Sequence, residues 1–328
     1  MLAAITTAHE SIYLEMYIFS NDTTGYDFLS ELERKACEGV RVIVVLDALG
    51  SFGLASSVID RLRSAGAEVL FFSYWFRRTH RKILIIDETI AFLGGVNISK
   101  RFERWNDLQV RVSGLIVTHI LRSFARVYHE CGGKNPALGV KDRPALFRRA
   151  RLWFIEHGVT PGRFVLRKHY EEHIDAAKRS IVLVTPYLIP HRWLTARLHQ
   201  AILRGVHVEI IVPARTDYAL ADRINRYYLI FFHKLGASGF LSDAMNHAKI
   251  MLIDDREGTI GSHNLDALSF DWNVEAGVFF DTPSMVHDLA RIVQSWKAEA
   301  MPLAPGAIKR HWYDIVFALL LRLFQPVL

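Results

Sequence analysis

The sequence contains an internal duplication, and this repeat limits the folds that the chain can adopt. Residues 11–14 (SIYL) recur as residues 180–183 (SIVL), and residues 39–42 (GVRV) recur as residues 205–208 (GVHV). Within each copy, short apolar runs typical of strands alternate with amphipathic stretches typical of helices. We therefore expect an α/β protein with two similar lobes, each a mixed β-sheet flanked by helices.

The alternation predicts a definite order of elements. The first copy is expected to contain strand 12–19, helix 26–38, strand 40–47, helix 58–64 and strand 68–72. The second is expected to contain strand 181–188, helix 193–203, strand 206–212 and helix 218–235. Turn residues at 132–136 and a basic stretch at 148–151 mark the join. The expected domains are a first lobe over residues 1–140, a second lobe over residues 141–300 and an apolar tail over residues 301–328.

Composition narrows the class of protein. Apolar residues make up 51% of the 328 residues, which is enough to bury sizeable cores and excludes a disordered chain. The two cysteines, Cys37 and Cys131, are too few for a disulfide framework or a Cys-rich zinc site. The net charge of +6 favours anionic partners, either nucleic acid phosphates or anionic lipid headgroups, and does not choose between them.

One motif, H-x-K-x4-D, occurs in both copies, and in both it is followed by a Gly and an Asn at the same spacing. A strand-like run begins at the first histidine, so His80 and Lys82 are expected to point to the same face. An imidazole can attack or protonate a phosphoryl group while an ammonium neutralises its oxygens. Asp87 has the opposite parity and is interpreted as an anchor for the turn. The expected catalytic set, with its repeat partners, is His80, Lys82, Asp87, His247, Lys249 and Asp254.

Polar residues after each motif complete the predicted site. Asn97, Ser262 and Asn264 are expected to bind the substrate phosphate through their side chains. Asp107 and Glu275 are expected to support the histidines from the far ring nitrogen, although surface acids on an edge strand would give the same pattern. No metal is expected, because the zinc-like pattern at residues 169–173 (HYEEH) has no repeat counterpart and no third ligand.

These residues resemble the phospholipase D superfamily and, within it, the bacterial cardiolipin synthases. The segments that carry the closer resemblance are residues 78–82 (RTHRK), 92–99 (FLGGVNIS), 105–110 (WNDLQV), 185–190 (TPYLIP) and 261–266 (GSHNLD). The resemblance implies two lobes about a pseudo-two-fold axis with the active site at their junction. It also implies a covalent phosphohistidine on His80, general acid and base chemistry by His247, and no cofactor.

The resemblance further implies a phosphatidyltransferase that forms cardiolipin from anionic phospholipids, with an alcohol acceptor such as a phosphatidylglycerol headgroup. A hydrolytic phospholipase D is the alternative, a phosphodiesterase or nuclease is less favoured, and a non-catalytic lipid-binding module is disfavoured by two intact motifs. No nucleic acid partner is expected. His191 and Leu268 stand where an Asp and an Arg are common in the family, which leaves the acceptor open.

The expected location is peripheral, on the cytoplasmic face of the bacterial inner membrane. No apolar run reaches the roughly 18–20 residues of a membrane-spanning helix. The basic and apolar stretch at residues 309–324 is expected to be either an interfacial helix or a last helix docked on the domain. Basic residues around the first motif suit an anionic membrane surface, namely Arg77, Arg78, Arg81, Arg101 and Arg104.

Overall fold

The structure is a computed structural model that describes residues 1–21, 27–139, 151–158 and 165–303. The described residues form two compact units that exchange short segments. The first unit takes its residues from Met1–Glu103, Leu108–Arg163 and Trp272–Val278. The second takes its residues from Arg104–Asp107, Phe164–Asp271 and Phe279–Leu328. The expected boundary after residue 140 precedes a strand that belongs to the first unit, and all but the first three residues of the expected tail lie outside the described residues.

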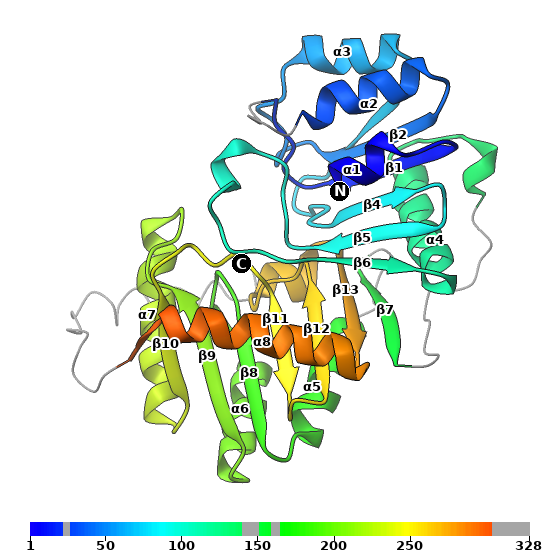
Figure 1. Ribbon diagram of the computed structural model, residues 1–328. Coiled ribbons are helices and arrows are strands. Elements are labelled where there is room, and N and C mark those ends of the chain that lie inside the picture. Colours follow the sequence, from blue (N-terminus) through cyan, green and yellow to red (C-terminus); the bar gives the residue numbers. More distant parts are fainter. Residues whose placement is uncertain (22–26, 140–150, 159–164, 304–328) are drawn as a thin grey trace. The chain divides into compact units, whose positions relative to one another are not determined.

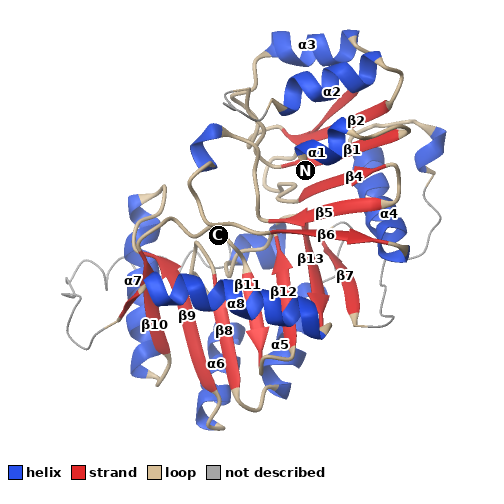
Figure 2. Ribbon diagram, in the orientation of Figure 1, coloured by secondary structure: helices blue, strands red, loops and turns tan. Residues whose placement is uncertain are grey.

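The first unit is built on a six-stranded mixed sheet (Figures 1 and 2). In sheet order the strands are β3 (Glu68–Phe72), β2 (Arg41–Asp47), β1 (Ser11–Met16), β4 (Lys82–Ile86), β5 (Ile90–Gly94) and β6 (Gln109–Ser113). Strands β1, β2 and β3 are parallel, whereas β4, β5 and β6 are each antiparallel to the strand before them in this order. The unit also holds β7 (Leu152–His157) and the short 3₁₀ turns η1 (Lys100–Phe102) and η2 (Pro136–Leu138).

Helices cover both faces of this sheet. Alternate residues of the strands form one core with α1 (Leu2–Thr6), α2 (Phe28–Cys37) and α3 (Ser56–Ser64). The opposite face packs against α4 (Leu115–Glu130), where the rings of Phe124 and Tyr13 lie 5.5 Å apart. Because both faces are covered, the strands read as nearly continuous apolar runs in the sequence.

The second unit repeats this arrangement. Its sheet has eight strands, of which six lie wholly within the second unit. In sheet order these six are β14 (Met301–Pro302), β10 (Ser238–Ser242), β9 (His207–Pro213), β8 (Ser180–Val184), β11 (Ile250–Ile253) and β12 (Glu257–Gly261). The helices are α5 (Val165–Ala176), α6 (Arg192–Leu203), α7 (Ala219–Lys234), α8 (Pro283–Glu299) and the π-helical turn η3 (Leu268–Trp272). Figure 1 shows α8, in orange, crossing one face of the sheet, with α5 and α6 behind it. Strand β13 (Glu275–Phe280) begins in the first unit and ends in the second.

The expected α/β fold with two similar mixed sheets is confirmed, and β3 has the expected bounds. Three expected strands were too long: those over residues 12–19 and 181–188 end earlier, at Met16 and Val184, and β4 begins at Lys82 and not at His80. The ladder between β1 and β4 stops at the pair Met16 and Lys82, and the backbone just before it bonds instead to Val274. Within the described ranges, every helix is too short or too polar to cross a lipid bilayer.

Each motif aspartate closes the turn that follows its strand. Asp87 lies in the left-handed region at φ 48° and accepts hydrogen bonds from the backbone amides of His9, Glu10 and Ser11 at 2.7–3.2 Å. Asp254, at φ 55°, accepts the amides of residues 178–180 in the same way at 2.7–2.9 Å. In both cases burial alone would raise the pKa, but the amide hydrogen bonds outweigh it and lower the pKa of the carboxyl.

We expect Asp254→Asn to lower the free energy of unfolding by about 1–3 kcal/mol, because a neutral amide accepts these hydrogen bonds less well. Asp255→Asn is the matched control: it lies in the same turn at φ 53° but is exposed, and it should change stability by less than about 0.5 kcal/mol. Urea denaturation of both variants at neutral pH measures the difference.

The lowered pKa of Asp254 also fixes a pH dependence. The stabilisation is complete above the ordinary value of 3.8 and is lost as the pH falls through the lower value of the folded protein. The gap between wild type and Asp254→Asn should therefore narrow in acid. A gap that stays constant as the pH falls, or that is equal for the two variants, would contradict the anchoring role.

Candidate functional site

The first motif lies at one edge of the first sheet. Strand β1 ends at Met16, which pairs with both Leu46 near the end of β2 and Lys82 at the start of β4. Strands β3 and β5 also end on this side. The loops that leave β1, β2, β3 and β5 therefore meet at the place where the chain enters β4 through His80. We call this side of the sheet the motif edge.

His80 is buried and faces a carboxylate that lies far away in the sequence. Its Nδ1 atom lies 3.0 and 3.2 Å from the two carboxylate oxygens of Glu275, which is fully buried. An ionised carboxylate can only accept, so Nδ1 must carry the proton and donate it. This contact selects the tautomer whose lone pair lies on Nε2. His80 is thus oriented as a nucleophile or base through Nε2.

Backbone pairing brings Glu275 to His80. The residue before each of them forms a bridge, Thr79 with Val274. The amide of His80 donates to the carbonyl of Val274 at 2.9 Å, and the amide of Val274 donates to the carbonyl of Arg78 at 2.8 Å. Residues 272–278 accordingly belong to the first unit, although they follow the second motif in the sequence.

Lys82 is almost fully buried beside the same histidine. Its Nζ atom donates to the carbonyl oxygen of His80 at 2.6 Å and lies 5.0 Å from the centre of the Tyr17 ring. That ring meets the imidazole of His80 edge-on, with centroids 4.7 Å apart. The Tyr17 ring thus packs against both motif side chains.

Arg81, between the two motif residues, points away from the site. It is fully buried and pairs with Glu15 at 2.8 Å, and it also donates to Ser123 of α4 at 2.8 Å. Thr79 donates its hydroxyl to Glu15 as well. Burial raises the pKa of Glu15, and the Arg81 charge opposes that rise. Glu15 therefore binds the side chains on both sides of His80, and the prediction that Arg81 belongs to the basic surface was wrong.

The second motif repeats the geometry with a different carboxylate. The Nδ1 atom of His247 lies 2.7 Å from Oδ2 of Asp107, and Lys249 donates its Nζ to the carbonyl of His247. The Trp105 ring lies against this imidazole at a centroid distance of 5.4 Å. All four side chains lie in the second unit, to which residues 104–107 belong.

The same kind of backbone bridge positions Asp107. Asn106 pairs with Asn246: its amide donates to Met245 at 2.9 Å, and its carbonyl accepts the amide of His247 at 2.7 Å. Each carboxylate therefore supports the histidine of the other motif in the sequence. The repeat positions were enough to identify Asp107 and Glu275 as supporting residues. They could not predict the crossed pairing, because local spacing in the sequence does not tell which distant segment lies beside which histidine.

The three residues expected to bind the substrate phosphate are all buried, and their hydrogen bonds differ. Asn97, nearly buried, accepts the amide of Ile18 through Oδ1 at 3.3 Å, which orients its NH₂ group as the donor. Asn264 donates its backbone amide to Ser269 at 3.0 Å, and its side chain is also nearly buried. Ser262 is fully buried.

Gly94 precedes Asn97 and lets two backbones approach closely. An added Cβ would lie 2.2 Å from the carbonyl oxygen of Leu108, so only glycine fits there. Asp87 and Asp254 lie beyond the far ends of β4 and β11, away from the histidine and lysine of their own motifs. Their contacts are with the backbone turns described above.

Sequence reasoning missed several side chains that shape the site. Tyr17 follows β1, and Asp47 ends β2. Functional groups commonly lie at the carboxyl ends of parallel strands, so their sequence position could have identified both residues. Asp47 is buried and accepts the amides of Thr79 and Gly50 at 3.0 and 2.9 Å. Burial raises its pKa, although these backbone hydrogen bonds oppose the rise.

Other polar groups of the second unit are paired elsewhere. His191 lies 2.9 Å from Asp271, and His173 pairs with Glu257. Across the described ranges, no cluster of three or more His, Cys, Asp or Glu residues has the geometry to hold a metal ion.

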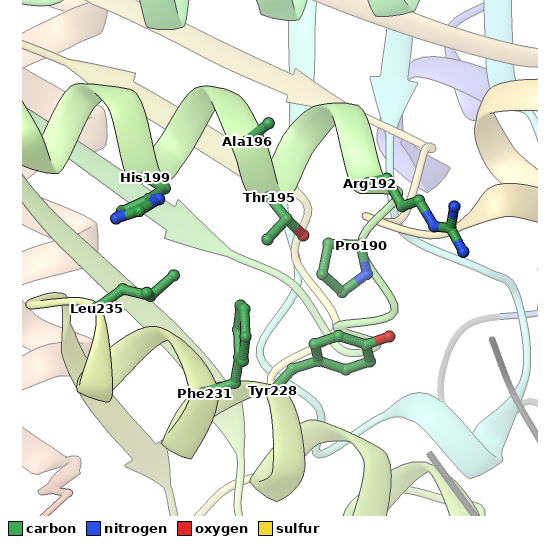
Figure 3. A pocket seen from close by; sticks show the side chains of 8 residues that line it. All are labelled: Pro190, Arg192, Thr195, Ala196, His199, Tyr228, Phe231 and Leu235. Atoms are coloured by element: carbon green, nitrogen blue, oxygen red, sulfur yellow. The ribbon is translucent and has the colours of Figure 1, made fainter. Parts of the chain in front are cut away.

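A hollow of about 400 Å³ lies between α6 and α7, lined by Arg192, Tyr228 and Phe231 among others (Figure 3). None of its lining residues belongs to either motif.

Comparison with known proteins agrees with the motifs. Residues 1–128 and 170–296 match the family described as cardiolipin synthase, PLD-like domain. Cardiolipin synthase A of Pseudomonas putida (strain W619) is 28% identical over 346 residues, covering 100% of this chain and 72% of that protein. Cardiolipin synthase 1 of Bacillus anthracis is 30% identical over 317 residues, covering 89% of this chain and 62% of that protein. Part of each relative's length thus has no counterpart here.

Two solved structures share the fold. Phosphatidylserine synthase of Haemophilus influenzae Rd KW20 superposes with a TM-score of 0.73 at 16% identity, covering 99% of this chain and 90% of that one. Polyphosphate kinase of Porphyromonas gingivalis superposes with a TM-score of 0.63 at 17% identity, covering 99% of this chain and 50% of that one. At these identities the likeness concerns the fold. The resemblance seen in the motifs is confirmed by the family match, which spans most of the sequence: the chain belongs to the cardiolipin synthase family of phospholipase D-like proteins.

Proposed function

We propose that this chain is a phosphatidyltransferase that forms cardiolipin from anionic phospholipids such as phosphatidylglycerol. The observation that carries the proposal is the repeated group of a buried histidine, a carboxylate on its Nδ1 atom and a lysine two residues further on. A transfer by way of a covalent intermediate needs one nucleophile and one proton carrier, and the two copies supply one of each. The cardiolipin synthases among the relatives support the choice of substrate.

In the first step, Nε2 of His80 attacks the phosphorus of a phosphatidylglycerol headgroup. The bond from phosphorus to the glycerol oxygen breaks, and His247 in its protonated form gives its Nε2 proton to that oxygen as glycerol leaves. Glu275 stabilises the positive charge that develops on the His80 ring. The ammonium groups of Lys82 and Lys249 neutralise the phosphoryl oxygens. The product of the step is a phosphatidyl group bound to His80.

In the second step, the acceptor hydroxyl of another phosphatidylglycerol takes the place of the departed glycerol. Neutral His247 removes its proton, the oxygen attacks phosphorus, and the bond to His80 breaks. Cardiolipin leaves, and both histidines return to their starting protonation states. If water replaces the alcohol, the same residues release phosphatidic acid, which is the hydrolytic alternative.

The product test uses purified full chain on phosphatidylglycerol vesicles in EDTA, with products identified by mass spectrometry. We expect cardiolipin and free glycerol in equal amounts, because every proposed step runs through imidazole and ammonium groups. Phosphatidic acid without cardiolipin would establish the hydrolase instead. Loss of turnover in EDTA that a divalent ion restores would contradict the mechanism.

The roles of the two histidines can be separated by the leaving group. We expect His80→Ala and His247→Ala each to lower turnover of phosphatidylglycerol by about 10⁴-fold or more. With a p-nitrophenyl phosphodiester, whose leaving group needs no proton, His247→Ala should still release one equivalent of p-nitrophenol and His80→Ala none. His199→Ala, a half-buried histidine outside the motifs, is the matched control. Release of p-nitrophenol by His80→Ala would show that His80 is not the nucleophile.

The crossed carboxylates give a further test. We expect Glu275→Gln and Asp107→Asn each to lower kcat by about 10- to 100-fold with phosphatidylglycerol, because each amide loses the charge that orients its histidine. With the p-nitrophenyl ester, the first-step loss should persist for Glu275→Gln, which acts on the nucleophile, and shrink for Asp107→Asn, which acts on the proton donor. The reverse pattern would contradict the pairing of Glu275 with His80. Partial rescue by Glu275→Asp would separate charge from side-chain length.

A further inference from the structure

Two loops at the motif edge expose large apolar side chains to solvent. The loop after β2 carries Leu49 and Phe52, which are 59% and 86% exposed. The loop after β3 carries Trp75 and Phe76, which are 84% and 70% exposed. Isolated exposed apolar residues are ordinary, but four large ones on adjacent loops are unfavourable in water and mark a contact surface. We call these four residues the apolar loops.

Side-chain hydrogen bonds to the backbone hold both loops in place. Asp47 accepts the amides of Leu49 and Gly50 in the first loop and the amide of Thr79 at the end of the second, at 2.9–3.0 Å. Arg78 donates from its guanidinium to the carbonyl of Tyr74. The exposed side chains thus stand on a fixed backbone, and their exposure is a property of the folded unit.

The first loop is also joined to the catalytic histidine. Ser51 donates its hydroxyl to the carbonyl of Tyr17 at 3.0 Å and accepts the amide of Phe19 at 3.1 Å. Gly50 lies so close to Tyr17 that an added Cβ would be 2.3 Å from its carbonyl oxygen. Tyr17 packs on the imidazole of His80. The apolar loops and the nucleophile therefore share one supporting network.

Apolar and basic side chains lie at different places along the motif edge. Strand order places the apolar loops beyond β3 and β2, His80 at the start of β4, and η1 after the end of β5. Exposed Lys100 and Arg101 lie in η1. The motif edge thus has an aromatic side, a phosphate-reacting histidine and a basic side, which matches the acyl boundary, the phosphodiester and the negative charge of a lipid interface.

We infer that the apolar loops are the docking surface of this chain on an anionic lipid bilayer, with Phe52, Trp75 and Phe76 entering the interface beside His80. The inference rests on the proposed function for the identity of the lipid, and on the geometry of the first unit for the surface. Trp and Phe side chains favour the boundary between the lipid headgroups and the acyl chains, because there their rings leave water while the adjoining backbone stays hydrated.

The experiment measures sedimentation of the full chain with vesicles of phosphatidylglycerol and phosphatidylcholine. We expect the triple variant Phe52→Ser, Trp75→Ser, Phe76→Ser to partition at least about tenfold more weakly than wild type, since the three side chains lose their apolar burial. Leu115→Ser is the matched control: this residue is 71% exposed and follows β6, whose far end lies at the opposite edge of the sheet. It should partition within about twofold of wild type.

Trp75 also reports its own position. Lipids with brominated acyl chains should quench its fluorescence in the bound protein, and the difference between wild type and Trp75→Phe isolates this residue from the other six tryptophans. Unchanged sedimentation of the triple variant would overturn the inference. So would a Trp75 shielded from iodide in vesicle-free solution and unaffected by brominated lipid, which would show that residues 304–328 or a second copy of the chain covers the loops.

A soluble substrate separates this inference from the proposed function. With dihexanoyl phosphatidylglycerol below its micellar concentration, the triple variant should turn over as fast as wild type, because no interface is involved. Loss of this activity in the triple variant would mean that the loops act on catalysis and not on docking. Vesicle binding that depends on the loops, in a chain that turns over no phospholipid, would keep the docking surface and reject the phosphatidyltransferase.

Discussion

The hydrogen bond between a buried histidine and a carboxylate from a distant segment is the interaction on which the geometry of each motif depends. A carboxylate without a partner is costly to bury, and the Nδ1–H group of His80 is a partner of the fully buried Glu275. The histidine in turn needs the carboxylate to fix its tautomer. The backbone bridge between Thr79 and Val274 holds the two at contact distance without relying on long side chains. The same arrangement serves His247 and Asp107.

The exchange of short segments between the two units follows from this requirement. Residues 272–278 join the first unit and residues 104–107 join the second, and each carries one supporting carboxylate. Neither half of the sequence therefore contains a complete histidine site. A single copy folded by itself would therefore leave its histidine without the supporting carboxylate. The exchange also explains why the strands stop short of His80 and His247: their backbones bond to the exchanged segments.

The anchoring aspartate and the proposed catalytic residues lie at opposite edges of each sheet. At one edge of the first sheet, Asp87 gathers the amides at the start of β1. At the other edge, Lys82 and His80 face the loops that carry Tyr17 and Asp47. The hydrogen bonds that the aspartate accepts therefore do not involve the proposed catalytic groups. The buried ion pair between Arg81 and Glu15 ties β1 to the residues that lead into β4. It lies on the face of the sheet opposite His80.

The sequence by itself determined the two-fold repetition, the α/β class, most strand and helix positions, and the histidine and lysine of each motif. These follow from periodicity and local spacing, which act over a few residues. Only the tertiary structure decided that Glu275 supports His80 and Asp107 supports His247, that Arg81 is buried, and that Phe52 and Trp75 stand exposed at the motif edge. Each of these depends on which distant segment crosses to which strand end. A local pattern carries no information about that choice, because the contact energy arises only after the chain has folded.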